Sequence, residues 1–225
     1  YSNTGYVIAG RIVEKVSGKP LFEFLQERIF KPLQMTTAQD FDSEPRSAGN
    51  ASGYTSFALG PPRAADVSGA GWLFGAGELA MTAEDLARWN ISIINRSLLS
   101  EASYRALETE TLLTSGVGTG YGLGVDVELA RQRRKLAHGG EVVGFTADNV
   151  IYPDDRTAIA VLVNKDASRA TCQISDKLAA LVFEQAQATD DAKAAQARAI
   201  FDGLQQGRLD RSLFTDNANY YFSDV

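Results

Sequence analysis

The chain has 225 residues, of which 44% are hydrophobic and 22% are charged, and its formal net charge is −6 at pH 7. This length and composition are typical of a globular protein with its own core, and the negative charge argues against nucleic acid or an anionic membrane as the main partner. Cys172 is the only cysteine and His138 the only histidine, so an intrachain disulfide and a structural zinc site are excluded, and we expect neither a metal nor another cofactor.

Two helices are predicted at the start of the chain. Between residues 4 and 17, apolar side chains recur at three- and four-residue spacing, which indicates an amphipathic helix. Pro20 is suited to the first turn of a second helix, predicted from Leu21 to about Phe30, which ends before Pro32.

The next part of the chain has the composition of an irregular loop. Glycine, serine, proline and alanine dominate residues 43–71, and long loops of this kind inside compact domains are often functional covers. Thr82 and Asp85 then have the spacing of a capping box, which predicts a helix that runs through Ile94.

Alternating apolar residues predict a run of strands in the second half of the chain. Pro153-Asp154-Asp155-Arg156 is typical of a hairpin turn, and the basic run at residues 131–135 is interpreted as a solvated turn before a strand. Helices followed by consecutive antiparallel strands and a closing helix indicate an α+β fold. The strands are expected at residues 125–129, within residues 135–145, and at residues 146–152 and 157–164.

The C-terminal part is predicted to be helical with a break. A helix is expected from Cys172, which we expect to be buried, to Gln187, and another at residues 194–206, with the polar stretch at 189–193 as a boundary. We therefore predict one domain at residues 1–188, followed at 189–225 by a linker helix and the start of a further domain that is cut off.

The only imidazole of the chain lies in the triplet His138-Gly139-Gly140. Two glycines weaken a strand, and they are expected where a ligand or another backbone must come very close. The alternative is a bulge beside a buried, hydrogen-bonded histidine. No serine is followed three residues later by a lysine, so the chain contains no self-evident nucleophile.

Several short motifs occur in a specific order along residues 1 to about 187. Tyr1-Ser2-Asn3 is similar to a Tyr-x-Asn motif, and His138-Gly139-Gly140 falls where Lys-Thr-Gly or His-x-Gly is expected. In this order the motifs resemble those of the class C β-lactamase-like serine hydrolases, which include penicillin-binding D-Ala-D-Ala carboxypeptidases, D-aminopeptidases and esterases. The other landmarks are residues 28–35 (with Gln34 where glycine is usual), 51–54, 69–72, 81–87, 121–124, 144–145 and 161–164.

The resemblance implies an antiparallel sheet flanked by helices that is incomplete at the N-terminus. In this family the nucleophile is the serine of a Ser-x-x-Lys segment that precedes the Tyr-x-Asn motif, and the chain begins after that point. We expect the chain to be a fragment, inactive alone, whose nucleophile comes from an N-terminal part of the same protein. The alternatives are a nucleophile on another chain and a degenerate protein.

The resemblance also assigns roles to three side chains. Tyr1 would help to move the proton of the absent serine and later protonate the leaving group. Asn3 would hold the substrate and the absent lysine, although the plain alternative is that it only caps the first helix. His138 would orient the tyrosine and lie near the carboxylate or leaving group of the substrate, so Tyr1 and His138 are expected to face each other across one cleft.

The backbone of the His-Gly-Gly segment is expected to bind the substrate. The N–H of Glu141 would contribute to an oxyanion hole. Gly139 and Gly140 would let a small-molecule or peptide substrate lie along the strand as an added strand.

A histidine in place of lysine bears on the substrate, because imidazole is mostly neutral at pH 7 whereas lysine is a cation. This favours a D-amino-acid peptidase or an esterase over a true β-lactamase. The alternatives are a non-hydrolytic penicillin-binding-like sensor or binding module, and a scaffold for a C-terminal partner domain. The resemblance suggests a periplasmic or secreted protein.

Overall fold

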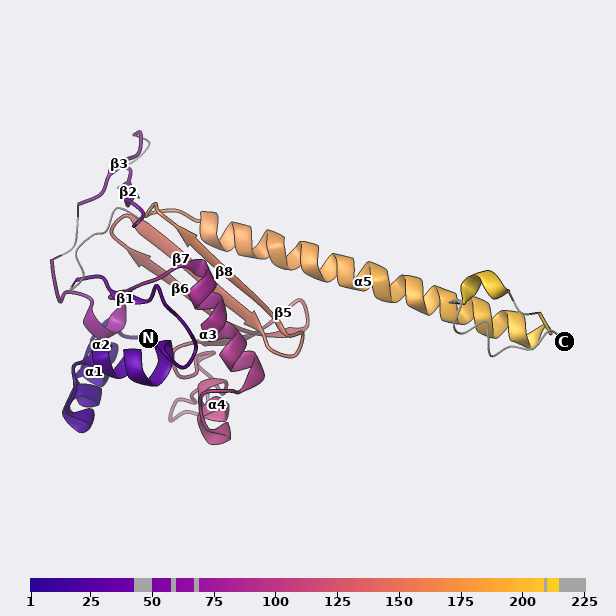
Figure 1. Cartoon of the computed structure of the whole chain (residues 1–225), viewed down its shortest axis with the longest axis horizontal. Coiled ribbons are helices and arrows are strands. Elements are labelled where there is room, and N and C mark those ends of the chain that lie inside the picture. Colours follow the sequence, from indigo (N-terminus) through magenta and orange to yellow (C-terminus); the bar gives the residue numbers. More distant parts are fainter. Residues whose placement is uncertain (43–49, 58–59, 67–68, 209, 215–225) are drawn as a thin grey trace. The chain divides into compact units, whose positions relative to one another are not determined.

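The computed structural model describes residues 1–42, 50–57, 60–66, 69–208 and 210–214, with the backbone alone at 185–190 (Figure 1). The chain forms two compact units, Tyr1–Asp176 and Lys177–Val225. The predicted domain division at residue 188 stays a prediction, and most of the tail expected to begin a further domain lies outside the described residues.

The main sheet of the first unit is an antiparallel meander of four strands (Figure 1). The turn at residues 153–156 is confirmed, because it joins the last two strands. The strand expected within residues 135–145 is confirmed, and the same stretch also includes the turn to the third strand, where Gly144 has a φ of 83°. The strands, in the order β5-β6-β7-β8, are β5 Asp126–Ala130, β6 Arg133–Val142, β7 Phe145–Tyr152 and β8 Thr157–Val163.

Helices and short strands make up the other regular elements of the described chain. The two-stranded pairs β1–β4 and β2–β3 are both antiparallel, and the second pair lies within the stretch predicted to be an irregular loop, parts of which are outside the described residues. The helices are α1 Asn3–Ser17, α2 Leu21–Leu25, the π-helix η1 Gln26–Phe30, the 3₁₀ helix η2 Phe74–Ala76, α3 Ala83–Asn95, α4 Glu101–Leu107, α5 Ala170–Gln205 and the 3₁₀ helix η3 Arg211–Leu213. The short strands are β1 Gln39–Asp40, β2 Tyr54–Thr55, β3 Arg63–Ala64 and β4 Leu79–Ala80.

Helix α3 and the first turns of α5 contact β7 from opposite sides. Asn90 of α3 and Asn149 of β7 donate to each other's amide oxygens at 2.7 and 2.9 Å. The neighbouring β7 residue, Asp148, accepts a hydrogen bond from Ser175 of α5. Because successive strand residues point to opposite faces, α3 covers one face of the sheet and the start of α5 the other. These layers confirm the predicted α+β architecture.

A buried cluster joins α3 and α4 to the sheet. Ile93, Tyr104, Leu136 and Ile151 are each at most 1% exposed and pack together. The Tyr104 hydroxyl donates to the backbone oxygen of Ser92 at 3.1 Å, so the one polar atom of this tyrosine is satisfied. Complete burial of each apolar side chain contributes roughly 1.5–3 kcal/mol to folding as an upper estimate.

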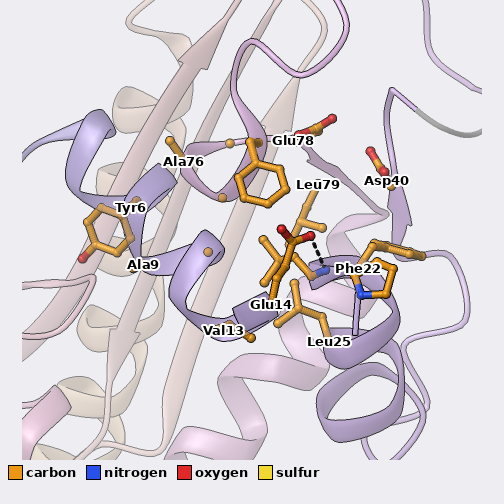
Figure 2. A pocket seen from close by; sticks show the side chains of 16 residues that line it. Tyr6, Ala9, Val13, Glu14, Phe22, Leu25, Asp40, Ala76, Glu78 and Leu79 are labelled. Atoms are coloured by element: carbon orange, nitrogen blue, oxygen red, sulfur yellow. Dashed lines mark hydrogen bonds between the residues drawn. The ribbon is translucent and has the colours of Figure 1, made fainter. Parts of the chain in front are cut away.

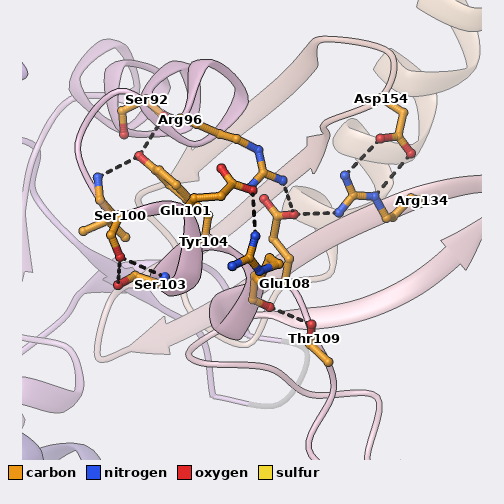
Figure 3. Close-up of polar contacts among 12 residues, drawn as sticks. Ser92, Arg96, Ser100, Glu101, Ser103, Tyr104, Glu108, Thr109, Arg134 and Asp154 are labelled. Carbon is orange, nitrogen blue, oxygen red and sulfur yellow. Dashed lines mark hydrogen bonds and ion pairs between the residues drawn. The ribbon is translucent and has the colours of Figure 1, made fainter.

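A nearly buried carboxylate ties the end of α3 to β6 (Figure 3). The Glu108 side chain is 6% exposed, and its Oε2 lies 2.9 Å from Arg96 Nη2 and 2.8 Å from Arg134 Nη1. Arg134 also pairs with Asp154 of the β7–β8 turn at 2.9 Å. The predicted solvated turn at residues 131–135 is therefore wrong in part, because only its first two residues form the turn.

Helix α1 begins one residue earlier than predicted. The Ser2 hydroxyl accepts from the backbone N–H of Gly5 at 3.3 Å, so Ser2 is the N-cap and the capping role considered for Asn3 is wrong. The second predicted helix continues to Phe30 but changes from α-helix to π-helix. Gln34, which stands where the related motif has glycine, has a left-handed φ of 56°.

Three further predictions concern the helices. Thr82 caps α3 as expected, because its hydroxyl accepts from the N–H of Asp85 at 3.3 Å. Cys172 is exposed, so its predicted burial is wrong; the buried stripe of α5 in this unit runs through Thr171 and Ser175 instead. Helix α5 is continuous across residues 189–193, and the predicted break is wrong, since polar residues without glycine or proline do not end a helix.

Candidate active site

The Tyr1 side chain is positioned by the first turn of α1. Its hydroxyl donates to Asn3 Oδ1 at 2.6 Å, and its ring stacks on Tyr6 with 5.4 Å between the ring centroids. Because Ser2 supplies the helix cap, the Asn3 amide is free of that task and bonds the phenol. Tyr1 as a residue remains 68% exposed, as required of a group that meets a substrate.

The single imidazole lies against this tyrosine. The ring centroids of Tyr1 and His138 are 5.4 Å apart and the rings meet edge to face at 62°. His138 is on β6 opposite Asn149, whose side chain contacts α3, so the imidazole lies on the α3 face of the sheet. Three residues predicted to share a site (Tyr1, Asn3 and His138) are therefore together, although 137 positions of sequence separate the first from the last.

Both ring nitrogens of His138 have hydrogen-bond partners within the chain. Nδ1 lies 2.6 Å from the backbone oxygen of Gly139, and Nε2 lies 2.9 Å from the hydroxyl of Tyr121. A carbonyl oxygen can only accept, so Nδ1 carries the proton. In the neutral ring Nε2 then accepts from Tyr121, whose hydroxyl is also 3.4 Å from that of Tyr6.

Tyr121 stays a neutral phenol in this setting. Burial raises its pKa far above the usual tyrosine range, and the hydrogen bond with Tyr6 raises it further. Its hydroxyl therefore retains a proton to donate at any physiological pH.

The glycine-rich segment at residues 118–124 explains how Tyr121 is held. Its backbone oxygen accepts from Thr111 at 2.8 Å, and the next residue, Gly122, packs so closely that a Cβ would lie 2.1 Å from the backbone oxygen of Leu107. Gly124 has a left-handed φ of 87° and lies beside Tyr6. No role for Tyr6 or Tyr121 is predicted from the sequence, where the one signal at residue 121 is an aromatic residue between glycines.

The segment of β6 that carries the two glycines has an open edge. Strand β5 pairs with β6 only as far as Ala137, whereas β7 pairs with residues 136–142. Within the described part of the chain, residues 138–142 thus have a strand partner on one side alone. Gly139, Gly140 and the backbone of Glu141, all predicted to bind substrate, lie on this segment, and the Glu141 side chain accepts from the N–H of Ala167 at 2.9 Å.

The turn after this segment is fixed by a carboxylate. Asp166 Oδ2 accepts from the N–H of Gly144 at 3.0 Å, and this backbone hydrogen bond lowers the pKa of Asp166. A Cβ on Gly53 would lie 2.7 Å from the ring of Phe145, so the 51–54 landmark packs directly against the start of β7. These contacts hold the open segment of β6 from its far end.

A cavity lies between α1, α2 and η2 (Figure 2). It has a volume of about 470 Å³ and is lined mainly by apolar residues. Burial raises the pKa of one lining carboxyl, Glu78, to about 7, and the nearby Asp42 and Asp40 raise it as well. Tyr6 lines this cavity and also belongs to the aromatic cluster, where its hydroxyl faces that of Tyr121.

The described residues offer neither a metal site nor a membrane-spanning helix. They contain no cluster of three or more histidine, cysteine, aspartate or glutamate residues that could bind a metal ion. None of their helices combines the length and hydrophobicity of a membrane span.

Comparison with known proteins identifies relatives of this chain. The chain is 26% identical over 187 residues to PbpX, a putative penicillin-binding protein of Bacillus subtilis, with 82% of this chain and 45% of the relative covered. It is 29% identical over 185 residues to a D-aminopeptidase of Cereibacter sphaeroides, covering 82% of this chain and 35% of the relative. The chain thus spans less than half the length of these curated relatives.

A solved structure has the same fold. The octameric penicillin-binding protein homologue from Pyrococcus abyssi superposes with a TM-score of 0.64 at 27% identity, over 75% of this chain and 39% of the other. This result and the family match confirm both the predicted fold class and the predicted family resemblance. Because the family model described as Beta-lactamase matches residues 1–182, the chain belongs to the beta-lactamase family.

Proposed function

We propose that the longer protein containing this chain is a serine hydrolase that cleaves amide or ester bonds through an acyl-enzyme. A Ser-x-x-Lys segment outside this chain, either from an N-terminal part of the same protein or from another chain, supplies the nucleophile. The relatives named above are more than twice as long as the stretch that aligns with them, which leaves room for such a segment.

One observation carries the proposal: the Tyr1 phenol, bonded to Asn3 at 2.6 Å, faces His138 beside the open edge of β6. An extended substrate on this edge gains backbone hydrogen bonds from residues 138–142. Its scissile carbonyl then lies near the phenol, where a proton donor to the leaving group is needed.

The residues divide the reaction between them. The incoming serine oxygen attacks the substrate carbonyl, and its proton passes to the lysine and Tyr1 pair. The N–H of Glu141 stabilises the negative oxygen of the tetrahedral intermediate, a contribution typically of about 3 kcal/mol. Tyr1 then protonates the leaving group, and water releases the acyl group by the same steps in reverse order.

The substrate class that we propose is an amide or ester of a D-amino acid. The cluster around Tyr1 consists of aromatic rings and an imidazole, so it offers apolar contact and few fixed charges. The aligned D-aminopeptidase of Cereibacter sphaeroides supports this choice.

The direct test uses the longer protein, a fluorescent fluorophosphonate and a chromogenic D-amino-acid amide. Wild type should react with the probe and turn over the amide, and Tyr1→Phe should lower kcat/KM by about 100-fold or more, since general acid–base catalysis contributes that much. Tyr54→Phe is the matched control, because Tyr54 is 41% exposed and it contacts the Gly144 turn through its backbone, which the substitution leaves in place.

Two results would count against the proposal. A slow, stable adduct without turnover would favour the penicillin-binding-like sensor. Full activity in Tyr1→Phe would remove the phenol from the chemistry. In addition, His138→Lys should improve hydrolysis of carboxylate-bearing substrates relative to neutral esters, and equal loss on both would contradict the position given to His138.

A further inference from the structure

His138 has more hydrogen bonds within the chain than a histidine that only lines a cleft would need. Its Nδ1 bonds the backbone oxygen of Gly139 at 2.6 Å, and its Nε2 bonds Tyr121 at 2.9 Å. The two contacts fix the ring plane, and each nitrogen has a protein partner. An imidazole held in this way has no free nitrogen for Tyr1.

Tyr1 makes its own hydrogen bond elsewhere. The phenol donates to Asn3, and its contact with His138 is between ring faces and edges. The two side chains therefore touch without a proton path between them. Tyr121 contacts both, since its ring centroid lies 6.0 Å from that of Tyr1 and 5.9 Å from that of His138.

We propose that Tyr121 is a positioning residue whose hydroxyl occupies Nε2 and keeps His138 in the Nδ1-protonated tautomer. The imidazole then holds the ring of Tyr1 in place by contact and does not act as a base. The effect of Tyr121 on catalysis rests on the proposed function, whereas its effect on the tautomer of His138 rests on the hydrogen bonds alone. The rigid glycine-rich segment around Tyr121 supports it, because Gly122 leaves no space for the loop to move towards Leu107.

The tautomer can be measured directly, because this chain contributes a single histidine. The longer protein is labelled with ¹⁵N-histidine, and the signal of His138 is identified by its loss in His138→Gln. Two-bond ¹H–¹⁵N spectra at about pH 8, where an ordinary imidazole is neutral, should show the proton on Nδ1. A proton on Nε2 in wild type would overturn the proposal, whatever the variants do.

Variants isolate the contribution of Tyr121. Tyr121→Phe keeps the ring and removes the hydroxyl, so the Nε2 resonance should move towards that of a nitrogen without a hydrogen-bond donor. Tyr6→Phe leaves the Tyr121–His138 contact in place and should leave the resonance unchanged. An unchanged Nε2 resonance in a folded Tyr121→Phe protein would overturn the assignment.

Kinetics give the catalytic consequence. Tyr121→Phe should lower kcat by about 10- to 100-fold, the loss expected when a side chain beside the reacting group is misplaced. KM should change little, because His138 and Tyr1 would act together only in the transition state. Loss expressed only in KM would contradict a positioning role. An inactive wild type would refute the proposed function, while the tautomer measurement would still decide the role of Tyr121.

Discussion

The two glycines of β6 allow the substrate position to be tested without disturbing the fold. A Cβ built on Gly139 comes no closer than 3.8 Å to any neighbour, and one built on Gly140 no closer than 4.0 Å, in both cases at Ala147. Both distances are ordinary van der Waals contacts. The described residues therefore give no steric reason for glycine at either position.

Replacement by alanine should thus stabilise the protein and impair the reaction. Each substitution removes backbone freedom from the unfolded chain and should raise the free energy of unfolding by about 0.5–1 kcal/mol. A methyl group forced against a packed substrate costs about 1–3 kcal/mol, which lowers kcat/KM by about 5- to 150-fold. Gly140→Ala should have the larger effect, because residue 140 points to the same face as His138.

The assay combines urea unfolding with kcat/KM for the D-amino-acid amide, both in the longer protein. Gly69→Ala is the control, because a Cβ there meets no atom of the described residues within 4 Å. Alanine variants that are more stable and fully active would refute a substrate on this edge. Variants that unfold more easily would show that the glycines serve the fold instead.

Two further predictions concern carboxyl groups away from the cluster. Glu108→Gln should lower the free energy of unfolding by about 3 kcal/mol, because two arginines lose a nearly buried partner. The control is Glu101→Gln at an exposed carboxylate, which should cost less than about 1 kcal/mol. Equal effects of the two substitutions in urea unfolding would contradict the network in Figure 3. The raised pKa of Glu78 means that the folded protein binds its proton more tightly, so stability falls as pH rises from the ordinary glutamate range to about 7. Glu78→Gln should remove this decline, which is about 1 kcal/mol for a partly solvated group. The measurement is the melting temperature of both proteins as a function of pH, and an equal change in the two proteins between those pH values would contradict the prediction.

The local rules of chain geometry predicted much of this fold from sequence. The turn at residues 153–156 and the cap at Thr82 depend on neighbouring residues only, and both were found as expected. The end of the strand within residues 135–145 could not be predicted, because the apolar residues on the two sides of Gly144 follow one another like a single strand. Which face of a helix is buried depends on distant partners, and for this reason Cys172 was placed inside and is exposed.

The candidate site was predicted only as far as its motifs reach. The positions of Tyr1, Asn3 and His138 came from the family resemblance, and the structure brings all three together. The parts played by Tyr6 and Tyr121 arise from tertiary contacts between α1, the glycine-rich segment and β6. A tyrosine between glycines carries no local indication of the ring that it will meet.

The most direct test of a shared catalytic centre is a double-mutant cycle between Tyr1 and His138 in the longer protein. The measured quantity is kcat/KM for wild type, Tyr1→Phe, His138→Gln and the double variant. Residues that act as one unit show losses that do not add, so the double variant should be only slightly worse than the poorer single variant. Losses that add in free energy, or a single variant with full activity, would contradict the account.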